Sequence, residues 1–405
     1  MRIYQVGGAI RDALLGLPVH DRDWVVVGAT PEQMLEQGFI PVGKDFPVFL
    51  HPHTHEEYAL ARTERKTAPG YHGFAFYTDA TVTLEDDLAR RDLTINAIAQ
   101  DENGALIDPY HGQKDLQQKV LRHVTNAFAE DPVRILRVAR FAARYADFCV
   151  APETMVLMRQ MVDAGEVDTL VAERVWQEIS RGLLEEKPSR MLDVLRDCGA
   201  LERILPEIAL QFDTQVFVNS EVGRGNEQYN AGQHIQALLD LGVEQHNSLA
   251  VQFALLLDMP DHNDRESIQT RAQRGQQRAE QISARLRVPT DCSELAQLSA
   301  KEKQNVLACM TANAQEIYEL FKRSDAFRQT QRFINLLKVA QTDALLRNGG
   351  ASVKRIQMLE NLLQQVLALD TKTITREAMA QGKKGKDVGL AIEQARLGFI
   401  NANWP

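Results

Sequence analysis

The sequence has few cysteines, no long apolar run and no excess of positive charge. Its 405 residues include four cysteines, none in a Cys-x-x-Cys pair, so neither a zinc site nor a disulfide framework is expected. No apolar stretch reaches the length that crosses a bilayer, and the first residues are typical of a strand, not of a signal peptide. These absences predict a protein of the reducing cytoplasm with no membrane partner.

The net charge of −9 does not by itself favour a polyanionic partner. Net charge averages over the whole chain, however, whereas nucleic-acid binding depends on local patches. Arginines do gather locally, at Arg90 and Arg91 and again at Arg134, Arg137, Arg140 and Arg144. A salt-sensitive basic groove on an acidic body is therefore compatible with the sequence.

A glycine turn near the amino terminus is suited to binding phosphate. Gly7 and Gly8 follow an expected strand over residues 3–6 and precede a short helix that carries Arg11. Glycine allows the backbone to approach a phosphate closely, and the start of a helix favours an anion. Alone, such a pair usually marks only a turn.

Two aspartates, Asp21 and Asp23, stand at the start of the next expected strand. Because side chains alternate along a strand, both are predicted to project from one face. Paired carboxylates repel unless a cation lies between them, and oxygen ligands suit Mg²⁺ bound jointly with substrate phosphates. With the glycine turn, the pair predicts Mg²⁺-dependent nucleotidyl transfer. Glu57, on a later strand, is a candidate third carboxylate, although a glutamate facing solvent is the commoner case.

The two motifs together, Gly7-Gly8-x-x-Arg11-Asp12 and Asp21-x-Asp23, resemble the signature of the polymerase-beta-type nucleotidyltransferases. The resemblance is to the class II tRNA nucleotidyltransferases, or CCA-adding enzymes, and to their relatives the bacterial poly(A) polymerases. It implies that the two aspartates are the catalytic metal ligands and that Gly8 and Arg11 cradle phosphates.

The same resemblance implies an α+β fold in three parts. Residues 1–125 would form the catalytic head with a mixed sheet. Residues 126–215 would form a helical neck that selects the nucleotide and binds RNA. Residues 216–405 would form a helical body and tail.

A second motif, Arg-Arg-Asp-x-x-x-Asn over residues 90–96, is similar to the next block of the family. The resemblance implies that Arg91 contacts the nucleotide phosphates or sugar, that Asp92 helps to hold the site and that Asn96 meets the substrate. Before this block, residues 63–81 show no helical period and are expected to form a long mobile loop. In the family, such a loop helps the enzyme switch to adding A.

A helix with four arginines is expected after Asp131 and Pro132, which suit its start. The arginines recur at spacings of three and four residues, at Arg134, Arg137, Arg140 and Arg144. With almost no acidic partner on the same turns they would repel one another, which favours an anion lying across them.

This segment resembles the Glu-Asp-x-x-Arg motif of the family, and its chemistry suits base selection. Cytosine and adenine present an amine donor beside a ring-nitrogen acceptor, whereas uracil and guanine present a carbonyl beside an N–H. If Asp131 accepts a hydrogen bond from the amine and Arg134 donates one to the ring nitrogen, the pair binds C and A and rejects U and G. Arg137 and Arg140 would hold the triphosphate or the surroundings of the incoming base.

The carboxy-terminal half departs from CCA-adding enzymes of the gammaproteobacterial type, which usually carry an HD phosphohydrolase domain. His234 stands where the first histidine belongs, but the His-Asp pair is replaced by Leu257-Asp258. Leucine has no lone pair for a cation, so we expect this degenerate site to be inactive. The alternative is that His246 or His262 substitutes.

The expected reaction is template-independent transfer of CMP and AMP, from CTP and ATP, to the 3′ hydroxyl of tRNA with release of pyrophosphate and Mg²⁺ as cofactor. Alternatives are a poly(A) polymerase, an enzyme adding only CC or only A, and, from a different class, an inactive RNA-binding protein. Poly(A) polymerases typically show a glycine, consecutive basic residues and Phe where this chain has Gly43-Lys44-Asp45-Phe46, so CCA addition is preferred. A monomer is expected, although the sequence does not define the oligomeric state.

Overall fold

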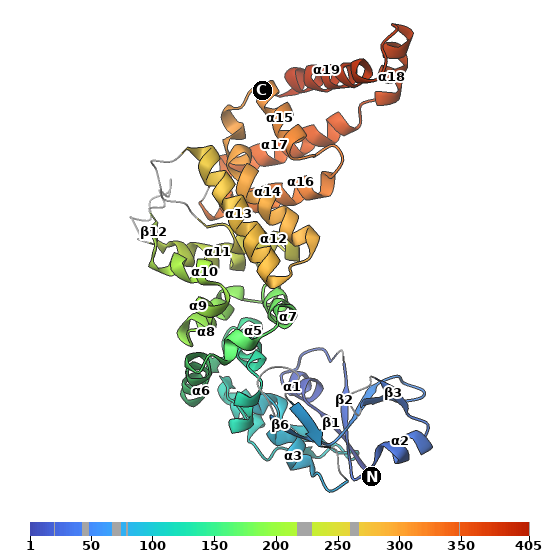
Figure 1. Cartoon of the computed structure of the whole chain (residues 1–405), viewed down its shortest axis with the longest axis vertical. Coiled ribbons are helices and arrows are strands. Elements are labelled where there is room, and N and C mark those ends of the chain that lie inside the picture. The colour runs from blue at the N-terminus through green and yellow to red at the C-terminus, as the bar shows by residue number, and fades with distance from the viewer. Residues whose placement is uncertain are drawn as a thin grey trace. The chain divides into compact units, whose positions relative to one another are not determined.

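The computed structural model describes residues 1–19, 21–42, 48–66, 74–77, 80–216, 229–259, 267–347 and 349–404. The chain divides into two compact units, residues 1–206 and residues 207–405 (Figure 1). The three-part division at residues 125 and 215 stays a prediction. Of the helices within the described ranges, none combines the length and apolar character needed to cross a bilayer. All four cysteines are free.

The first unit is built on a mixed sheet, which together with the helices that follow confirms the predicted α+β class. Among the described residues, seven strands pair in the order β3-β4-β5-β2-β1-β8-β9, with β1 antiparallel to β2 and β2 parallel to β5. The strands of this sheet are β1 (Arg2–Val6), β2 (Asp23–Val27), β3 (Ile40–Val42), β4 (Val48–Leu50), β5 (Glu57–Leu60), β8 (Ala99–Gln100) and β9 (Leu106–Ile107).

Apolar side chains cover both faces of this sheet, because residues alternate along its strands. On one face, Val25 and Val27 of β2 pack with Leu88 of α3 (Leu84–Ala89). On the other face, Val26 packs with Met34 of α2 (Pro31–Glu36). Asp23 shares the face of Val25 by the same alternation, which is the side of α3.

Residues 63–81 contain a short ladder, so the expectation of a loop without regular structure was wrong for part of this segment. β6 (Thr63–Lys66) pairs antiparallel with β7 (Phe74–Tyr77). The sequence between them includes Pro69-Gly70, a turn signal, and β7 is rich in aromatic residues that favour strands. Residues 67–73 and 78–79 lie outside the described ranges, as do residues 43–47.

Helices complete the first unit. α5 packs against α7 and α8. β10 (Val120–Leu121) pairs in parallel with β11 (Cys149–Val150) before the helical region continues. The remaining helices are α1 (Gly8–Leu14), α4 (Gly112–Gln118), α5 (Val133–Arg144), α6 (Pro152–Asp163), α7 (Ala172–Gly182), α8 (Pro188–Asp197) and α9 (Ala200–Ile204).

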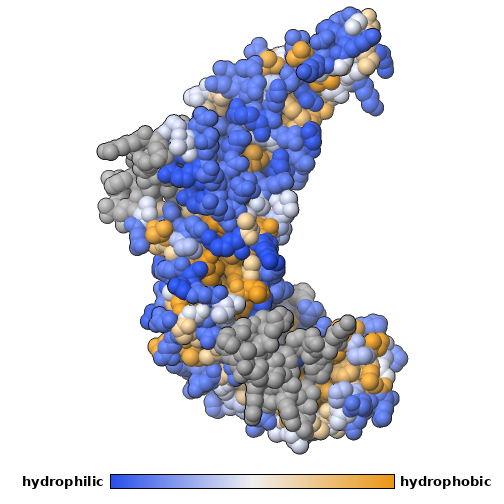
Figure 2. Space-filling model, in the orientation of Figure 1, coloured by the Kyte–Doolittle hydropathy of each residue, from blue (hydrophilic) through white to orange (hydrophobic). Residues whose placement is uncertain are grey.

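The second unit is helical apart from a two-residue ladder between β12 (Gln215–Val216) and β13 (Tyr229–Asn230), within the part of the chain that is described. α14 is its central helix and packs against α12, α13 and α16. The surface over α13 and α14 is predominantly hydrophilic (Figure 2). The helices are α10 (Pro206–Ala209), α11 (Ala231–Glu244), α12 (Leu249–Leu256), α13 (Ile268–Leu286), α14 (Thr290–Leu307), α15 (Ala314–Arg323), α16 (Thr330–Leu346), α17 (Gly350–Leu367), α18 (Thr371–Ala380) and α19 (Lys386–Asn403).

Candidate active site

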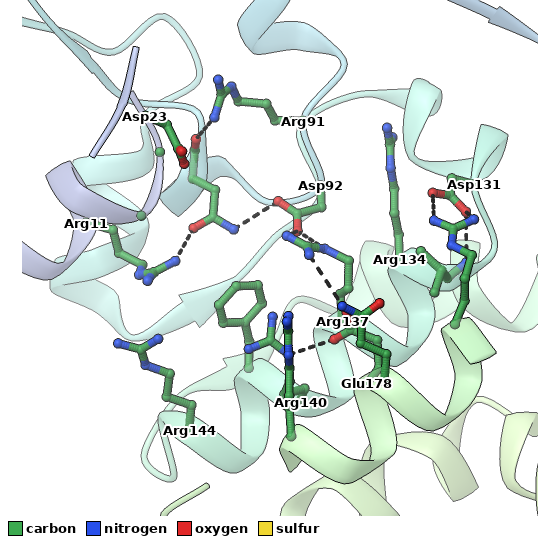
Figure 3. Close-up of a pocket in the computed structure, with 18 of the residues that line it drawn as sticks. Arg11, Asp23, Arg91, Asp92, Asp131, Arg134, Arg137, Arg140, Arg144 and Glu178 are labelled. Carbon is green, nitrogen blue, oxygen red and sulfur yellow. Dashed lines mark hydrogen bonds and ion pairs between the residues drawn. The ribbon is translucent and has the colours of Figure 1, made fainter. Parts of the chain in front are cut away.

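The first unit contains a polar pocket of about 560 Å³ (Figure 3). Its wall comes from the β1–α1 turn, the start of β2, residues 90–96, α5 and α7. Nine arginines and four carboxylates line it, so the lining carries a clear excess of positive charge. With Asp23, the predicted nucleotide-binding residues all lie on this wall: Gly8, Arg11, Arg91, Asp92, Asn96, Asp131, Arg134, Arg137 and Arg140.

The glycine turn is shaped by its backbone and by Arg91. Gly7 has a φ of 74°, in the left-handed region that favours glycine, and its N–H donates to the carbonyl of Ile98 at 3.2 Å. A Cβ at this position would lie 2.8 Å from Nη1 of Arg91, too close for that side chain to keep its place. Position 7 therefore requires glycine for two reasons: its φ is positive, and Arg91 of the pocket lies where a Cβ would be.

The two predicted metal ligands differ in their backbone setting. β2 begins at Asp23, opposite Val6, because the partner strand ends there and the chain turns at Gly7. Asp21 thus precedes the strand, so strand alternation does not reach it, and its projection from the same face as Asp23 stays a prediction. Asp21 is exposed and does not line the pocket, whereas Asp23 does.

Glu57 lies next to Asp23. The two residues are register partners in the parallel pair of β2 and β5, and neighbours in register project from the same side of a sheet. Both side chains are exposed, and within the described part of the chain neither has a cationic partner. Glu57 is exposed to solvent, as is usual for a glutamate on a strand, but it is also the neighbour of Asp23 in the sheet.

A buried chain of hydrogen bonds connects Arg11 to Arg137 through Asn96 and Asp92. Asn96 accepts from Nη1 of Arg11 at 2.5 Å and donates from Nδ2 to Asp92 at 2.9 Å. Asp92 also accepts from Nε of Arg137 at 2.8 Å. Burial would raise the pKa of Asp92, but the charge of Arg137 and the donors around the carboxylate outweigh it, so this pKa lies well below its usual range. Both ends of the Asn96 amide are engaged by side chains of the pocket.

Arg137, Arg140 and Arg144 of α5 have acidic partners on other elements, so the argument that the arginines would repel one another for want of partners was wrong for these three. Arg137 pairs with Asp92 at 2.8 Å, Arg140 with Glu178 of α7 at 2.6 Å, and Arg144 with Asp12 of α1 at 3.0 Å. These carboxylates come from distant segments, which spacing along one helix cannot reveal. The excess of arginine in the pocket remains after this pairing.

Phe141 organises three of these guanidinium groups. Its buried ring lies 5.2 Å from Arg11, 5.8 Å from Arg137 and 4.9 Å from Arg140, measured from Cζ to the ring centroid. A cation within about 6 Å of an aromatic face is attracted by the ring quadrupole. One aromatic side chain thus helps to gather positive charge from α1 and α5 on the same wall.

Asp131 and Arg134, the predicted base-selecting pair, are joined through the backbone, since the N–H of Arg134 donates to the carbonyl of Asp131 at 3.0 Å, while their side chains bond to other groups. Asp131 accepts two bonds from Arg174, at 3.1 Å and 2.7 Å, and one from the backbone N–H of Val133 at 3.2 Å. Arg134 donates from Nη1 to the carbonyl of Ala127 at 2.7 Å. Asp131 thus bonds to the first N–H of α5 from one position before the N-cap, which is Pro132, so the expectation of Asp131 as N-cap and Pro132 as the first helical residue was wrong by one residue.

Arg174 is among the lining residues that the sequence patterns did not indicate. It lies on α7, a helix whose apolar spacing indicates only scaffold. The signal was on its polar face, where Arg174, Gln177 and Arg181 recur at helical spacing and all line the pocket.

Comparisons with known proteins find family models and relatives that together match most of this chain. The family model for the poly A polymerase head domain matches residues 3–122, and the model for a probable RNA and SrmB-binding site of polymerase A matches residues 147–211. A multifunctional CCA protein of Leptothrix cholodnii is 52% identical, over 98% of this chain and 95% of its own. That of Azoarcus sp. (strain BH72) is 54% identical, over 86% and 85%.

Solved structures with a similar fold include a tRNA-processing enzyme in an apo form. It is 25% identical, with a TM-score of 0.62 over 99% of this chain and 93% of its own. The CCA-adding enzyme of Bacillus stearothermophilus in complex with CTP is 20% identical, with a TM-score of 0.65 over 99% and 89%, and shows the fold.

Proposed function

The chain belongs to the family of the multifunctional CCA proteins, and from this premise we propose that the pocket of its first unit is where CMP and AMP are transferred to tRNA. The family expected from the glycine and aspartate motifs is thereby confirmed. The reaction is template-independent addition of CCA to the tRNA 3′ end, from CTP and ATP, with release of pyrophosphate.

One observation carries the proposal. A single pocket joins a carboxylate suited to metal, a glycine turn suited to phosphate and a carboxylate suited to an exocyclic amine, at Asp23, Gly8 and Asp131. A nucleoside triphosphate needs these three contacts at once, and the arginine excess balances its negative charge. A binding module for RNA alone has no need for exposed, unpaired carboxylates beside a phosphate site.

Nucleotidyltransferases with this type of head use a divalent metal ion, and Mg²⁺ is the ion we propose here. Asp21 and Asp23 would hold it, with Glu57 beside Asp23 as a third oxygen donor. These hard ligands fit Mg²⁺, which is typically bound by one or two carboxylates together with substrate phosphates. Among the described residues, no three His, Cys, Asp or Glu side chains are placed to hold an ion unaided, which agrees with an ion shared with the triphosphate. When bound, Mg²⁺ would lower the pKa of the attacking hydroxyl and neutralise charge on the leaving pyrophosphate.

Phosphate binding is assigned to the turn and to the arginines around Phe141. Gly8 leaves room for an oxygen at the start of α1, and Arg11 reaches the same space, held by Asn96 and by Asp12 at 2.8 Å. Arg91 lies over Gly7. Arg137 and Arg140 are held by Asp92 and Glu178, which orient their guanidinium groups before any nucleotide binds. In this assignment Asn96 acts by positioning Arg11.

Base selection is assigned to Asp131 and Arg134, with Arg174 as the group that orients Asp131. An ionised carboxylate has about four acceptor sites, so Asp131 can keep its bonds to Arg174 and still accept from the amine of cytosine or adenine. Arg134 has further N–H groups besides the one donated to Ala127. With Asp131 facing the exocyclic position and Arg134 facing the ring nitrogen, uracil or guanine would set a carbonyl against the carboxylate and an N–H against the guanidinium, so UTP and GTP are rejected.

An assay with purified full-length protein and tRNA ending before the CCA sequence tests the proposal. CTP alone should give addition of two C residues, CTP with ATP should give CCA, and neither UTP nor GTP should be incorporated. A poly(A) polymerase would instead extend RNA in runs with ATP alone, and an enzyme adding only CC or only A would stop accordingly. Absence of any incorporation would contradict the proposal. Cytoplasmic location and a monomeric state remain predictions.

A further inference from the structure

A buried polar cluster lies among the helices of the second unit. Lys303 of α14 stands between two carboxylates, Asp258 after α12 and Asp343 of α16, and His234 of α11 and Arg347 complete the group. Lys303, His234 and Asp343 are 6%, 5% and 0% exposed, values that are rare for charged side chains. Four segments of the chain thus contribute to one charged core.

The bonds within this cluster are directed at the ammonium group. Nζ of Lys303 donates to both oxygens of Asp258, at 2.6 Å to Oδ1, and to Oδ2 of Asp343 at 3.2 Å. The other oxygen of Asp343 accepts from Nε of Arg347 at 2.8 Å and lies 3.4 Å from Nε2 of His234. Each carboxylate is satisfied, and two cationic side chains balance two anionic ones.

The donors around Lys303 are of the kind that bind metal. Imidazole nitrogens and carboxylates are common ligands of transition metals, but with Lys303 between the two carboxylates these described side chains are not placed to hold an ion. Buried carboxylates need a cation, and here that cation is part of the chain. We propose that the ammonium group of Lys303 permanently replaces a divalent cation between His234, Asp258 and Asp343 and keeps this site closed to metal ions.

Charge balance explains why a metal ion cannot displace Lys303 easily. The ammonium group already lies within hydrogen-bond distance of both carboxylates. A divalent ion entering beside it would leave uncompensated positive charge in a buried core. Leu257, next to Asp258, is buried and supplies no ligand.

The expected loss of phosphohydrolase activity remains a prediction, for which the lysine supplies a second reason. His246 is exposed, unlike the buried cluster, and His262 lies outside the described ranges. The proposal concerns the second unit and does not depend on the reaction assigned to the first.

Metal counting on the full-length protein tests the proposal. The double substitution Asp21→Asn and Asp23→Asn serves as the background, so that ions bound by the first unit do not contribute. With Lys303 intact, Mn²⁺ or Ni²⁺ should show no stoichiometric binding in equilibrium dialysis. Lys303→Ala in this background should bind about one ion per chain, and the ion should raise its melting temperature. Lys301→Ala, at an exposed position on the same helix, is the matched control and should do neither.

Two results would overturn the proposal. The first is stoichiometric binding by the background protein with Lys303 intact that disappears with His234→Ala. The second is a folded Lys303→Ala protein that neither binds nor is stabilised by Mn²⁺, Ni²⁺ or Co²⁺. If the Lys303→Ala protein does not fold without added metal, it is refolded in the presence of each of the three ions. Recovery of folded protein with any of them supports the proposal, and failure to fold with all three contradicts it.

Discussion

Asp23 and Glu57 lie side by side on the parallel strands β2 and β5, and their side chains project from the same side of the sheet. Neither carboxylate has a cationic partner within the described ranges, although the pocket that Asp23 lines is rich in arginine. Paired carboxylates of this kind favour a shared cation, which is why we propose Glu57 as a further metal ligand.

Glu57→Gln should weaken the metal site without removing it. We expect the Mg²⁺ concentration for half-maximal CCA addition to rise about tenfold or more, because a supporting oxygen donor loses its charge. A titration of activity with Mg²⁺ measures this shift. Glu56→Gln is the matched control, since Glu56 precedes β5 and bonds to Thr54. Equal Mg²⁺ dependence of the two variants would remove Glu57 from the site.

Arg174→Ala should relax base selection. The two bonds from Arg174 fix Asp131, and charge-assisted bonds of this kind are worth about 1.5–3 kcal/mol each. Discrimination against UTP and GTP should fall by about 10- to 100-fold, while binding of the triphosphate changes less. Arg159→Ala, an arginine that does not line the pocket, should leave discrimination unchanged.

The double variant Asp131→Ala, Arg174→Ala separates positioning from direct contact. If Arg174 acts through Asp131, the double variant should be no less selective than Asp131→Ala alone. Additive losses would show that Arg174 reads the base independently.

Gly7→Ala should disturb Arg91 in addition to the backbone. Both Gly7 and Gly16 have positive φ, 74° and 71°, but a Cβ at Gly16 meets nothing within 4 Å. Each substitution should cost about 1–2 kcal/mol of stability from backbone strain. Gly7→Ala alone should also raise KM for both CTP and ATP, as measured by steady-state kinetics. Parallel kinetic defects in the two variants would mean that the contact with Arg91 is irrelevant.

Acid should destabilise the first unit through Asp92. The pKa of this carboxyl in the folded protein lies below its unfolded value of 3.8, so its stabilising contribution is present above pH 3.8 and is lost as the pH falls further. Asp92→Asn leaves Arg137 without its buried partner and should cost about 3–5 kcal/mol at pH 7. Urea unfolding followed by tryptophan fluorescence, in a Trp404→Phe background that leaves Trp24 and Trp176, reports on this unit. The difference in the free energy of unfolding between the Asp92→Asn protein and its parent should become smaller below about pH 4. A difference that stays constant with pH would show that another group causes the acid destabilisation.

Local patterns were sufficient to find most of the pocket wall. The glycine turn at Gly7 and the bond from Asp131 to the start of α5 depend on residues close in sequence, and the structure contains both. Local patterns do not indicate where the neighbouring strand in the sheet ends, and this limit decides where a strand begins. β2 therefore begins at Asp23 because β1 ends opposite it, not because of its own residues.

Partners from distant segments could not be predicted. Asp12, Asp92 and Glu178 lie 132, 45 and 38 residues along the chain from the arginines they hold. Only packing of α5 against other elements brings these partners together. The acidic partners of Arg174 and Lys303 could not be predicted for the same reason. In the sequence each is one basic residue on a helix, and only the structure places each of them beside carboxylates.

The most direct test of the central claim is incorporation of CMP and AMP into tRNA that lacks its CCA end by Asp23→Asn protein, at saturating Mg²⁺. A metal ion in such a site supplies several kcal/mol of transition-state stabilisation, so the rate should fall by about a thousandfold or more while tRNA binding and folding are retained. The Asp21→Asn protein should show a similar fall in rate and should also keep its fold and its binding of tRNA. Incorporation near the wild-type rate by the Asp23→Asn protein would contradict the assignment of this pocket as the active site.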